Sequence, residues 1–165
     1  PGSIGHLAGE LIKQIAGIDM LHVPYPGTAK AVTAVLIGEV SLTSSSMQQT
    51  VPQIKAGKVK ALGVTGTRPS RFMPELQPLA DQGFKGLNVT AWYGLYAPLK
   101  SPRPAIRTLR DTFQKVLQDP GVRQKINAAG IELIWEVAEE QTAKRIEADL
   151  KRYRGVVQAA HIKAN

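Results

Sequence analysis

The chain lacks cysteine, has few aromatic residues and contains no long apolar run. Without cysteine it can form no disulfide or thiolate metal site, and it has no cysteine nucleophile. No stretch approaches the roughly 18 apolar residues that a membrane helix needs, and the 165 residues show no signal-peptide pattern. Aromatic residues make up only 5% of the chain and do not interleave with basic ones, as they would on a nucleic-acid-binding surface.

Acidic residues are also scarce, with 13 Asp and Glu against 21 Lys and Arg, which gives a net charge of +8. The basic residues are spread along the C-terminal region between acidic ones instead of forming one block. We therefore expect a solvated basic surface and no nucleic-acid partner. A hydrophobic fraction of 43% is ordinary for a globular protein, and the length suits one domain or two small lobes.

Apolar residues at helical spacing predict a first helix over about 4–16, with Ser3 as N-cap and Gly17 at its end. Asp119-Pro120 is a helix-start pattern, in which Asp caps and Pro takes the first position. Other helices are expected over 28–38, 47–56, near 76–82, and over about 138–160, with a further apolar stripe at Ile106, Leu109, Phe113, Val116 and Leu117.

Apolar segments between these helices are expected to form strands. They are 21–24, 40–43, 59–65, 87–97 and 131–135. Strands that alternate with short helices indicate parallel βαβ units, and such sheets bind ligands at the carboxyl ends of their strands. We therefore expect an α/β fold whose candidate ligand-binding turns are 25–28, 43–46 and the loop after Val64.

The segment from 21 to 40 gives the strongest site signal. Its short strand enters a Pro-Tyr-Pro-Gly turn, and a helix begins at once through Thr28. Unpaired backbone N–H groups, a hydroxyl and the positive helix end therefore meet at one point, which suits a carboxylate. Tyr25, Gly27 and Thr28 are candidate ligand contacts; the alternative is ordinary turn chemistry, with Gly27 providing backbone freedom and Thr28 a cap.

Two further places share this chemistry. Ser3 and Gly5 lie at the start of the first helix, where the alternative to ligand contact is a plain helix cap. Ser44, Ser45 and Ser46 follow a predicted strand, where three hydroxyls suit a polar ligand or simply a solvated loop and cap.

Catalysis and metal binding have little support in the sequence. A serine hydrolase using Ser44–Ser46 is the weakest alternative, because no Gly-x-Ser-x-Gly elbow surrounds these residues and no histidine has an evident acidic partner. We expect His6 and His22 to be structural, and we expect no metal and no cofactor.

The chain carries five ordered motifs: SIGHLAGE at 3–10, HVPYPGT at 22–28, GEVSLTSSS at 38–46, KAGKVKALGV at 55–64 and AWYGLYAP at 91–98. Together they resemble the Bug-type periplasmic substrate-binding proteins of tripartite tricarboxylate transporters. The register continues through the C-terminal helices, so the resemblance covers essentially the whole chain.

The resemblance implies a type II periplasmic-binding-protein-like fold without catalysis, located in the periplasm. Residues 1–90 would form the second α/β lobe with a parallel-type sheet, and 91–165 a crossover strand and helices that return to an incomplete first lobe. The protein would bind a small carboxylate, such as an amino acid, a di- or tricarboxylate or an aromatic carboxylate, and deliver it to a membrane permease. The implied ligand contacts are Ser3, Gly5, Tyr25, Gly27, Thr28, Ser44, Ser45 and Ser46.

One departure from the family pattern leaves an alternative open. The first half of the family's sequence, including most of one lobe, would lie upstream of Pro1. The chain could then be a truncated remnant that binds nothing and is stabilised as a homo-oligomer.

Overall fold

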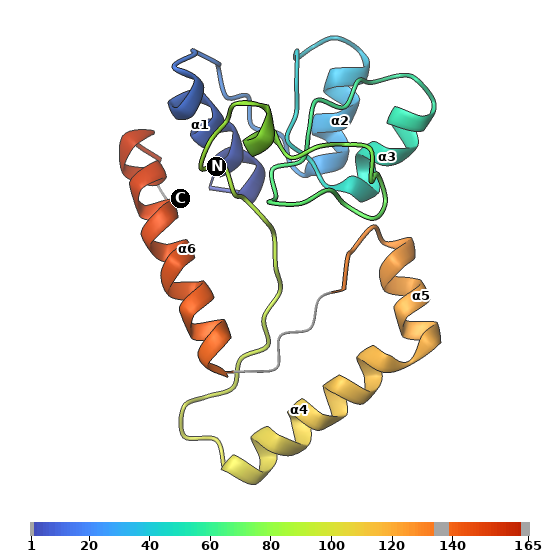
Figure 1. Cartoon of the computed structure of the whole chain (residues 1–165), viewed down its shortest axis with the longest axis vertical. Coiled ribbons are helices and arrows are strands. Elements are labelled where there is room, and N and C mark those ends of the chain that lie inside the picture. The colour runs from blue at the N-terminus through green and yellow to red at the C-terminus, as the bar shows by residue number, and fades with distance from the viewer. Residues whose placement is uncertain (1, 134–138, 163–165) are drawn as a thin grey trace. The chain divides into compact units, whose positions relative to one another are not determined.

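The computed structural model describes residues 2–133 and 139–162. Its elements, shown in Figure 1, are α1 (Ile4–Ala16), α2 (Thr28–Leu36), α3 (Met47–Lys55), the 3-10 helix η1 (Leu79–Gln82), α4 (Arg103–Gln118), α5 (Pro120–Ala128) and α6 (Glu139–Ala159). The chain divides into two compact units, Pro1–Thr90 with Glu136–Asn165, and Ala91–Trp135.

Local capping chemistry sets the ends of α1 and the start of α5. The Ser3 hydroxyl accepts a hydrogen bond from the His6 N–H at 3.3 Å, and Gly17 ends α1 in the left-handed region at a φ of 64°. Asp119 Oδ1 accepts from the Val122 N–H at 2.9 Å, directly before Pro120. The predictions for these helix ends are confirmed.

The core of the first unit lies between α1, α6 and the segment that precedes residue 90. Its buried centre consists of Ala8, Leu87 and Val89. Partly buried side chains pack around it from α1, η1, the loop after η1, and α6: Leu11, Ile12, Ile15, Leu79, Phe84 and Tyr153. Within the same unit α2 packs against α3.

The expected strands at 21–24, 40–43, 59–65 and 87–97 are wrong as regular ladders, since within the described residues β pairing is limited to isolated bridges. Val64 bridges Pro78 in parallel, and the Val89 N–H donates to the Thr65 carbonyl at 2.8 Å. A strand needs a neighbouring strand to accept its hydrogen bonds along its length. The other extended segments have no such neighbour among the described residues. The fifth prediction, 131–135, lies partly outside the described residues, and 131–133 is not in a strand.

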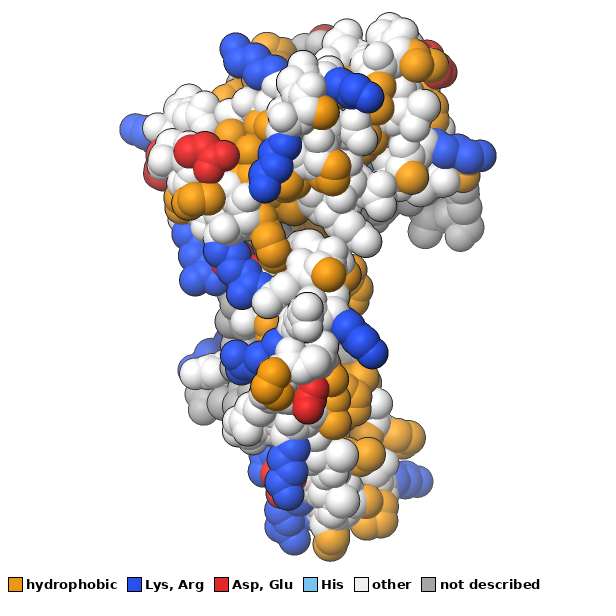
Figure 2. All heavy atoms as spheres, turned by 90° about the vertical axis from the view of Figure 1, so that its right-hand side faces the viewer, with side chains coloured by type: hydrophobic (Ala, Val, Ile, Leu, Met, Phe, Trp, Pro, Cys, Tyr) orange, Lys and Arg blue, Asp and Glu red, His pale blue; other side chains and the backbone are white. Residues whose placement is uncertain are grey.

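The second unit packs α4 against α5 and leaves much of its apolar surface open. Neither helix has a fully buried residue, and Leu109, on the predicted apolar stripe of α4, is 56% exposed. Before α4, Tyr93 is 86% exposed, Leu95 66% and Tyr96 72%. Figure 2 shows Lys and Arg side chains scattered over the visible face and not gathered into one block. None of the helices in the described ranges is long and apolar enough to cross a membrane.

Candidate functional site

Ser3 caps the N-terminus of α1, and Gly5 lies in the first turn of that helix. Ser3 has extended backbone at φ −67° and ψ 159°, and its hydroxyl oxygen already accepts the His6 N–H. A hydroxyl has a donor in addition to its lone pairs, so capping leaves the Ser3 O–H available to an anion. The cap and the ligand contact considered for Ser3 are therefore compatible.

Gly5 lets residues 43–46, the serine loop, approach this turn closely. A Cβ atom built on Gly5 would lie 2.6 Å from the Ser44 carbonyl oxygen, so the two backbones touch where a side chain would stand. In the same loop the Thr43 and Ser45 hydroxyls share a hydrogen bond at 2.8 Å. Ser46 is the N-cap of α3, with no side-chain capping hydrogen bond. The structure thus brings Gly5 and Ser44 together at the start of α1.

The turn before α2 has the geometry that its glycine predicts. Gly27 occupies the N-cap position at a φ of 97°, a conformation that side chains rarely adopt, and no side chain caps α2. The Gly27 N–H donates to the Tyr25 carbonyl at 2.9 Å, so this donor is used within the turn. Thr28 is the first residue of α2, and the first-turn amides after it face no side-chain acceptor from the cap.

The Tyr25 side chain reaches toward the far end of α2. Its hydroxyl donates to Glu39 Oε1 at 2.9 Å, beyond the C-terminus of that helix. Loss of hydration and the neighbouring Glu39 carboxylate raise the pKa of the Tyr25 phenol. In this conformation the Tyr25 hydroxyl is paired with Glu39.

His6 and His22 are in contact with one another. Their rings are stacked, with centroids 3.7 Å apart and planes 10° apart, which ties the first turn of α1 to the segment that leads into the 25–28 turn. His6 Nε2 lies 3.7 Å from Glu10 Oε1, and Lys13 Nζ lies 3.2 Å from Glu10 Oε2. Sequence reasoning placed each histidine in a structural role but missed the stack, because the two positions are far apart in the sequence and no motif joins them.

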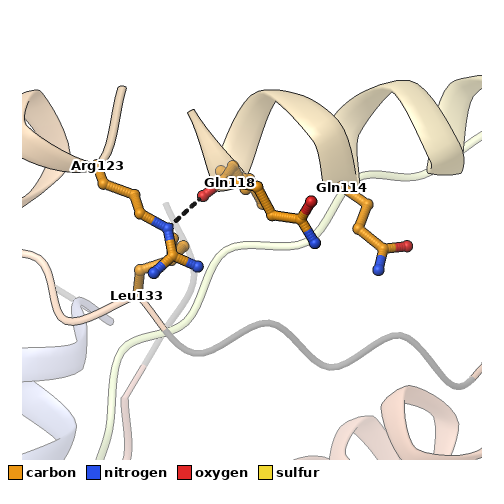
Figure 3. Close-up of a pocket in the computed structure, with 5 residues that line it drawn as sticks. Gln114, Gln118, Arg123 and Leu133 are labelled. Atoms are coloured by element: carbon orange, nitrogen blue, oxygen red, sulfur yellow. Dashed lines mark hydrogen bonds between the residues drawn. The ribbon is translucent and has the colours of Figure 1, made fainter. Parts of the chain in front are cut away.

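A pocket that the structure does show lies elsewhere, in the second unit, where side chains of α4 and α5 meet Leu133. It has a volume of about 150 Å³ and none of the predicted site residues lines it; the lining residues are Gln114, Leu117, Gln118, Arg123 and Leu133 (Figure 3). The Arg123 Nε–H donates to the Leu117 carbonyl at 2.8 Å there. Over the described ranges, no group of three or more His, Asp or Glu side chains is placed to hold a metal ion.

Comparison with known sequences points to one family. The pattern of the tripartite tricarboxylate transporter family receptors matches residues 1–162. A protein encoded in the clcB–clcD intergenic region of Pseudomonas knackmussii is 32% identical over 130 residues, covering 78% of this chain and 77% of that protein. A protein from the tcbD–tcbE intergenic region of Pseudomonas sp. strain P51 is 30% identical over 165 residues, covering 99% of this chain and 49% of that protein.

Solved structures show the same fold. An R. palustris protein solved with adipate superposes with a TM-score of 0.80 at 27% identity, over 98% of this chain and 54% of that one. The periplasmic binding protein BugD gives 0.79 at 28% identity, over 99% and 55%. MatC from Rhodopseudomonas palustris with bound malate gives 0.77 at 26% identity, over 94% and 54%. This chain therefore spans about half the length of those structures.

These matches confirm the predicted periplasmic-binding-protein fold class, although β pairing in the described part of the chain is reduced to isolated bridges. The family is one of solute-binding receptors and not of enzymes, so the serine hydrolase alternative gains no support. From its sequence match over residues 1–162 and its fold, the chain belongs to the tripartite tricarboxylate transporter receptor family.

Proposed function

We propose that the chain is the part of a periplasmic receptor that binds a small carboxylate without catalysis and delivers it to the transporter's membrane permease. The observation that carries the proposal is the contact of Gly5 with Ser44, which places the serine loop at the N-terminus of α1. Two relatives of similar fold were solved with dicarboxylates, adipate and malate. Dicarboxylates are therefore the first ligands to test.

The proposed contacts use hydroxyls and helix ends. The hydroxyls of Ser3, Thr28 and Ser46 and the uncapped first-turn amides of α2 would donate hydrogen bonds, and the positive ends of these helices would stabilise the negative charge. Gly5 would permit the close approach of the loop, and Gly27 the turn conformation. Ser44 and Ser45 would contribute through the shape and hydroxyls of that loop, and Tyr25 through its place in the turn.

The domain assignment forms part of this proposal. Residues 1–90 would be one lobe of the receptor, and 91–165 would cross over and return to the other lobe. The periplasmic location and the permease partner are supported by family membership.

Titration calorimetry of the chain with malate and adipate tests the proposal. We expect binding that weakens about fivefold or more in Thr28→Val and in Ser46→Ala, since each substitution removes one hydrogen bond to a charged group. Thr33→Val is the matched control, because the Thr33 hydroxyl donates to the Ala29 carbonyl within the same helix α2. Equal losses in Thr33→Val and Thr28→Val, or no heat from either acid, would contradict the proposal.

One observation favours a second candidate, a binding-incompetent chain stabilised by oligomerisation. The segment before α4 exposes large apolar side chains at Tyr93, Leu95 and Tyr96, and exposed apolar area of this kind favours association. Light scattering after size-exclusion chromatography separates the two candidates. A dimer that gives no heat with either acid supports the second, and a monomer that binds supports the first.

A further inference from the structure

We propose that the stacked His6 and His22 rings form a clamp that positions the start of α1 against the segment entering α2, and that the clamp holds only while both rings are uncharged. We call this pair the histidine clamp. Its effect on ligand affinity rests on the function proposed above, whereas its effect on α1 does not.

Two contacts, one of them the clamp, hold the first turn of α1 against neighbouring segments. On one side His6 stacks on His22 at 3.7 Å, three residues before Tyr25. On the other side the α1 backbone at Gly5 touches the Ser44 carbonyl, just before α3 begins. Loss of either contact frees the start of α1 relative to the segments that lead into α2 and α3. The spacing of the proposed anion contacts would then change.

The hydrogen bonds of His6 specify its neutral form. The Gly2 N–H donates to His6 Nδ1 at 3.1 Å, so Nδ1 must be unprotonated and the ring proton is assigned to Nε2, which faces Glu10. A second proton would turn Nδ1 into a donor and break the bond from Gly2, next to the Ser3 cap. If His22 were also charged, the two stacked rings would repel each other.

The groups around the clamp set its response to pH. Burial lowers the pKa of His6; the Glu10 carboxylate opposes this, and the positive charge of Lys13 adds to it. Partial loss of hydration also lowers the pKa of His22, as do the charges of His6 and Lys13, against an opposing effect of Glu10. Both histidines therefore bind a proton more tightly when their rings are apart than when they are stacked. The clamp weakens as the pH falls below about 6.5.

Amide hydrogen exchange tests the clamp without any ligand. The Leu7 N–H donates to the Ser3 carbonyl at 3.0 Å and reports on the first turn of α1. We expect its protection, corrected for intrinsic exchange, to fall about fivefold or more between about pH 7.5 and pH 5, relative to the Arg123 N–H in α5. His161→Asn is the control, because His161 is exposed and Asn tolerates its φ of 51°, so this variant should keep the full response.

Two substitutions of His22 distinguish the effect of its charge from the effect of its ring. His22→Phe keeps an aromatic ring that cannot be charged, so we expect normal protection at about pH 7.5 and a reduced loss in acid. His22→Ala removes the ring and should lose protection at both pH values. Equal protection in His22→Ala and the unmodified chain at about pH 7.5 would overturn the clamp, as would a pH response that is unchanged in His22→Phe.

Calorimetry with adipate and malate links the clamp to binding. At each pH the affinity of the unmodified chain is divided by the affinity of His22→Phe, so that protonation of the ligand itself cancels. We expect this ratio to fall about fivefold between pH 7.5 and pH 5. No heat at either pH contradicts the proposed function while the exchange data still decide the clamp. Measurable binding with unchanged exchange overturns the clamp alone.

Discussion

The Ser44 carbonyl oxygen occupies the space where a side chain on Gly5 would begin, 2.6 Å from an ideal Cβ. The oxygen belongs to backbone, which cannot move aside as the end of a flexible side chain can. Because alanine favours helix over glycine by about 1 kcal/mol, a contact this short must reverse the usual sign of the substitution.

We expect Gly5→Ala to lower the free energy of unfolding by about 1–3 kcal/mol, since the serine loop must shift away from α1. Gly9→Ala is the matched control, because Gly9 lies in the same helix with nothing within 4 Å of an added Cβ. It should raise the free energy of unfolding by up to about 1 kcal/mol. Urea denaturation followed by circular dichroism measures both, and midpoints that move in the same direction would refute the close contact.

The buried Tyr153 hydroxyl has no partner at good hydrogen-bonding geometry in the part of the chain that the structure describes, although the Arg152 guanidinium lies near it. Burial and the nearby Asp149 carboxylate raise its pKa, and Arg152 partly offsets them. We expect Tyr153→Phe to stabilise the fold by about 1 kcal/mol, because it removes an unsatisfied polar atom and keeps the ring in the core. Tyr25→Phe, which removes the exposed bond to Glu39, should leave the midpoint of urea denaturation close to that of the unmodified chain. A destabilised Tyr153→Phe would mean that the hydroxyl has a partner.

Arg152 fastens α6 to the chain that precedes residue 90. Its Nη1 donates to the Asn88 carbonyl at 2.8 Å and to Asp149 Oδ1 at 3.1 Å. Arg152→Met keeps the apolar stem and should cost about 1–2 kcal/mol, since the carbonyl loses a charge-assisted donor. Lys151→Met, at an exposed neighbouring position of α6, is the control. If the two variants unfold at the same temperature in thermal melts, the hydrogen bonds of Arg152 contribute nothing to stability.

The two histidines also predict how global stability depends on pH. Their pKa values in the folded chain lie below the ordinary 6.5, so the unfolded chain binds protons first as the pH falls. The free energy of unfolding should therefore be highest above about pH 6.5 and decline through the window below it. Urea midpoints at several pH values measure this decline, which should be shallower in His22→Phe. A midpoint that rises on acidification would reverse the assigned direction of the shifts.

Helices were predictable from the sequence because their hydrogen bonds and caps are local. Residues 3–17 include the apolar spacing of α1 and both of its caps, Ser3 and Gly17. The predicted span 4–16 matches the observed helix. The strands were not predictable in this way, since 21–24 and 40–43 need a neighbouring strand that no local pattern supplies. Val64 forms a bridge because Pro78 happens to lie beside it.

The candidate site likewise has some features that the local sequence predicts and others that it does not. The cap at Ser3 and the glycine turn at Gly27 follow from residue type alone, and the structure shows both. The Gly5–Ser44 contact and the His6–His22 stack join segments far apart in the chain, which only the folded arrangement brings together. Their role in binding a ligand remains a prediction for the experiments above.

The open segment before α4 has a consequence for the behaviour of concentrated solutions. Residues 91–97 carry no charge and present Tyr93, Leu95 and Tyr96 to water, a composition shared by segments that pair between copies into insoluble β-structure. The net charge of +8 keeps copies apart at low ionic strength. Added salt shortens the reach of that repulsion to about 8 Å at physiological strength, so solubility should fall as salt is raised.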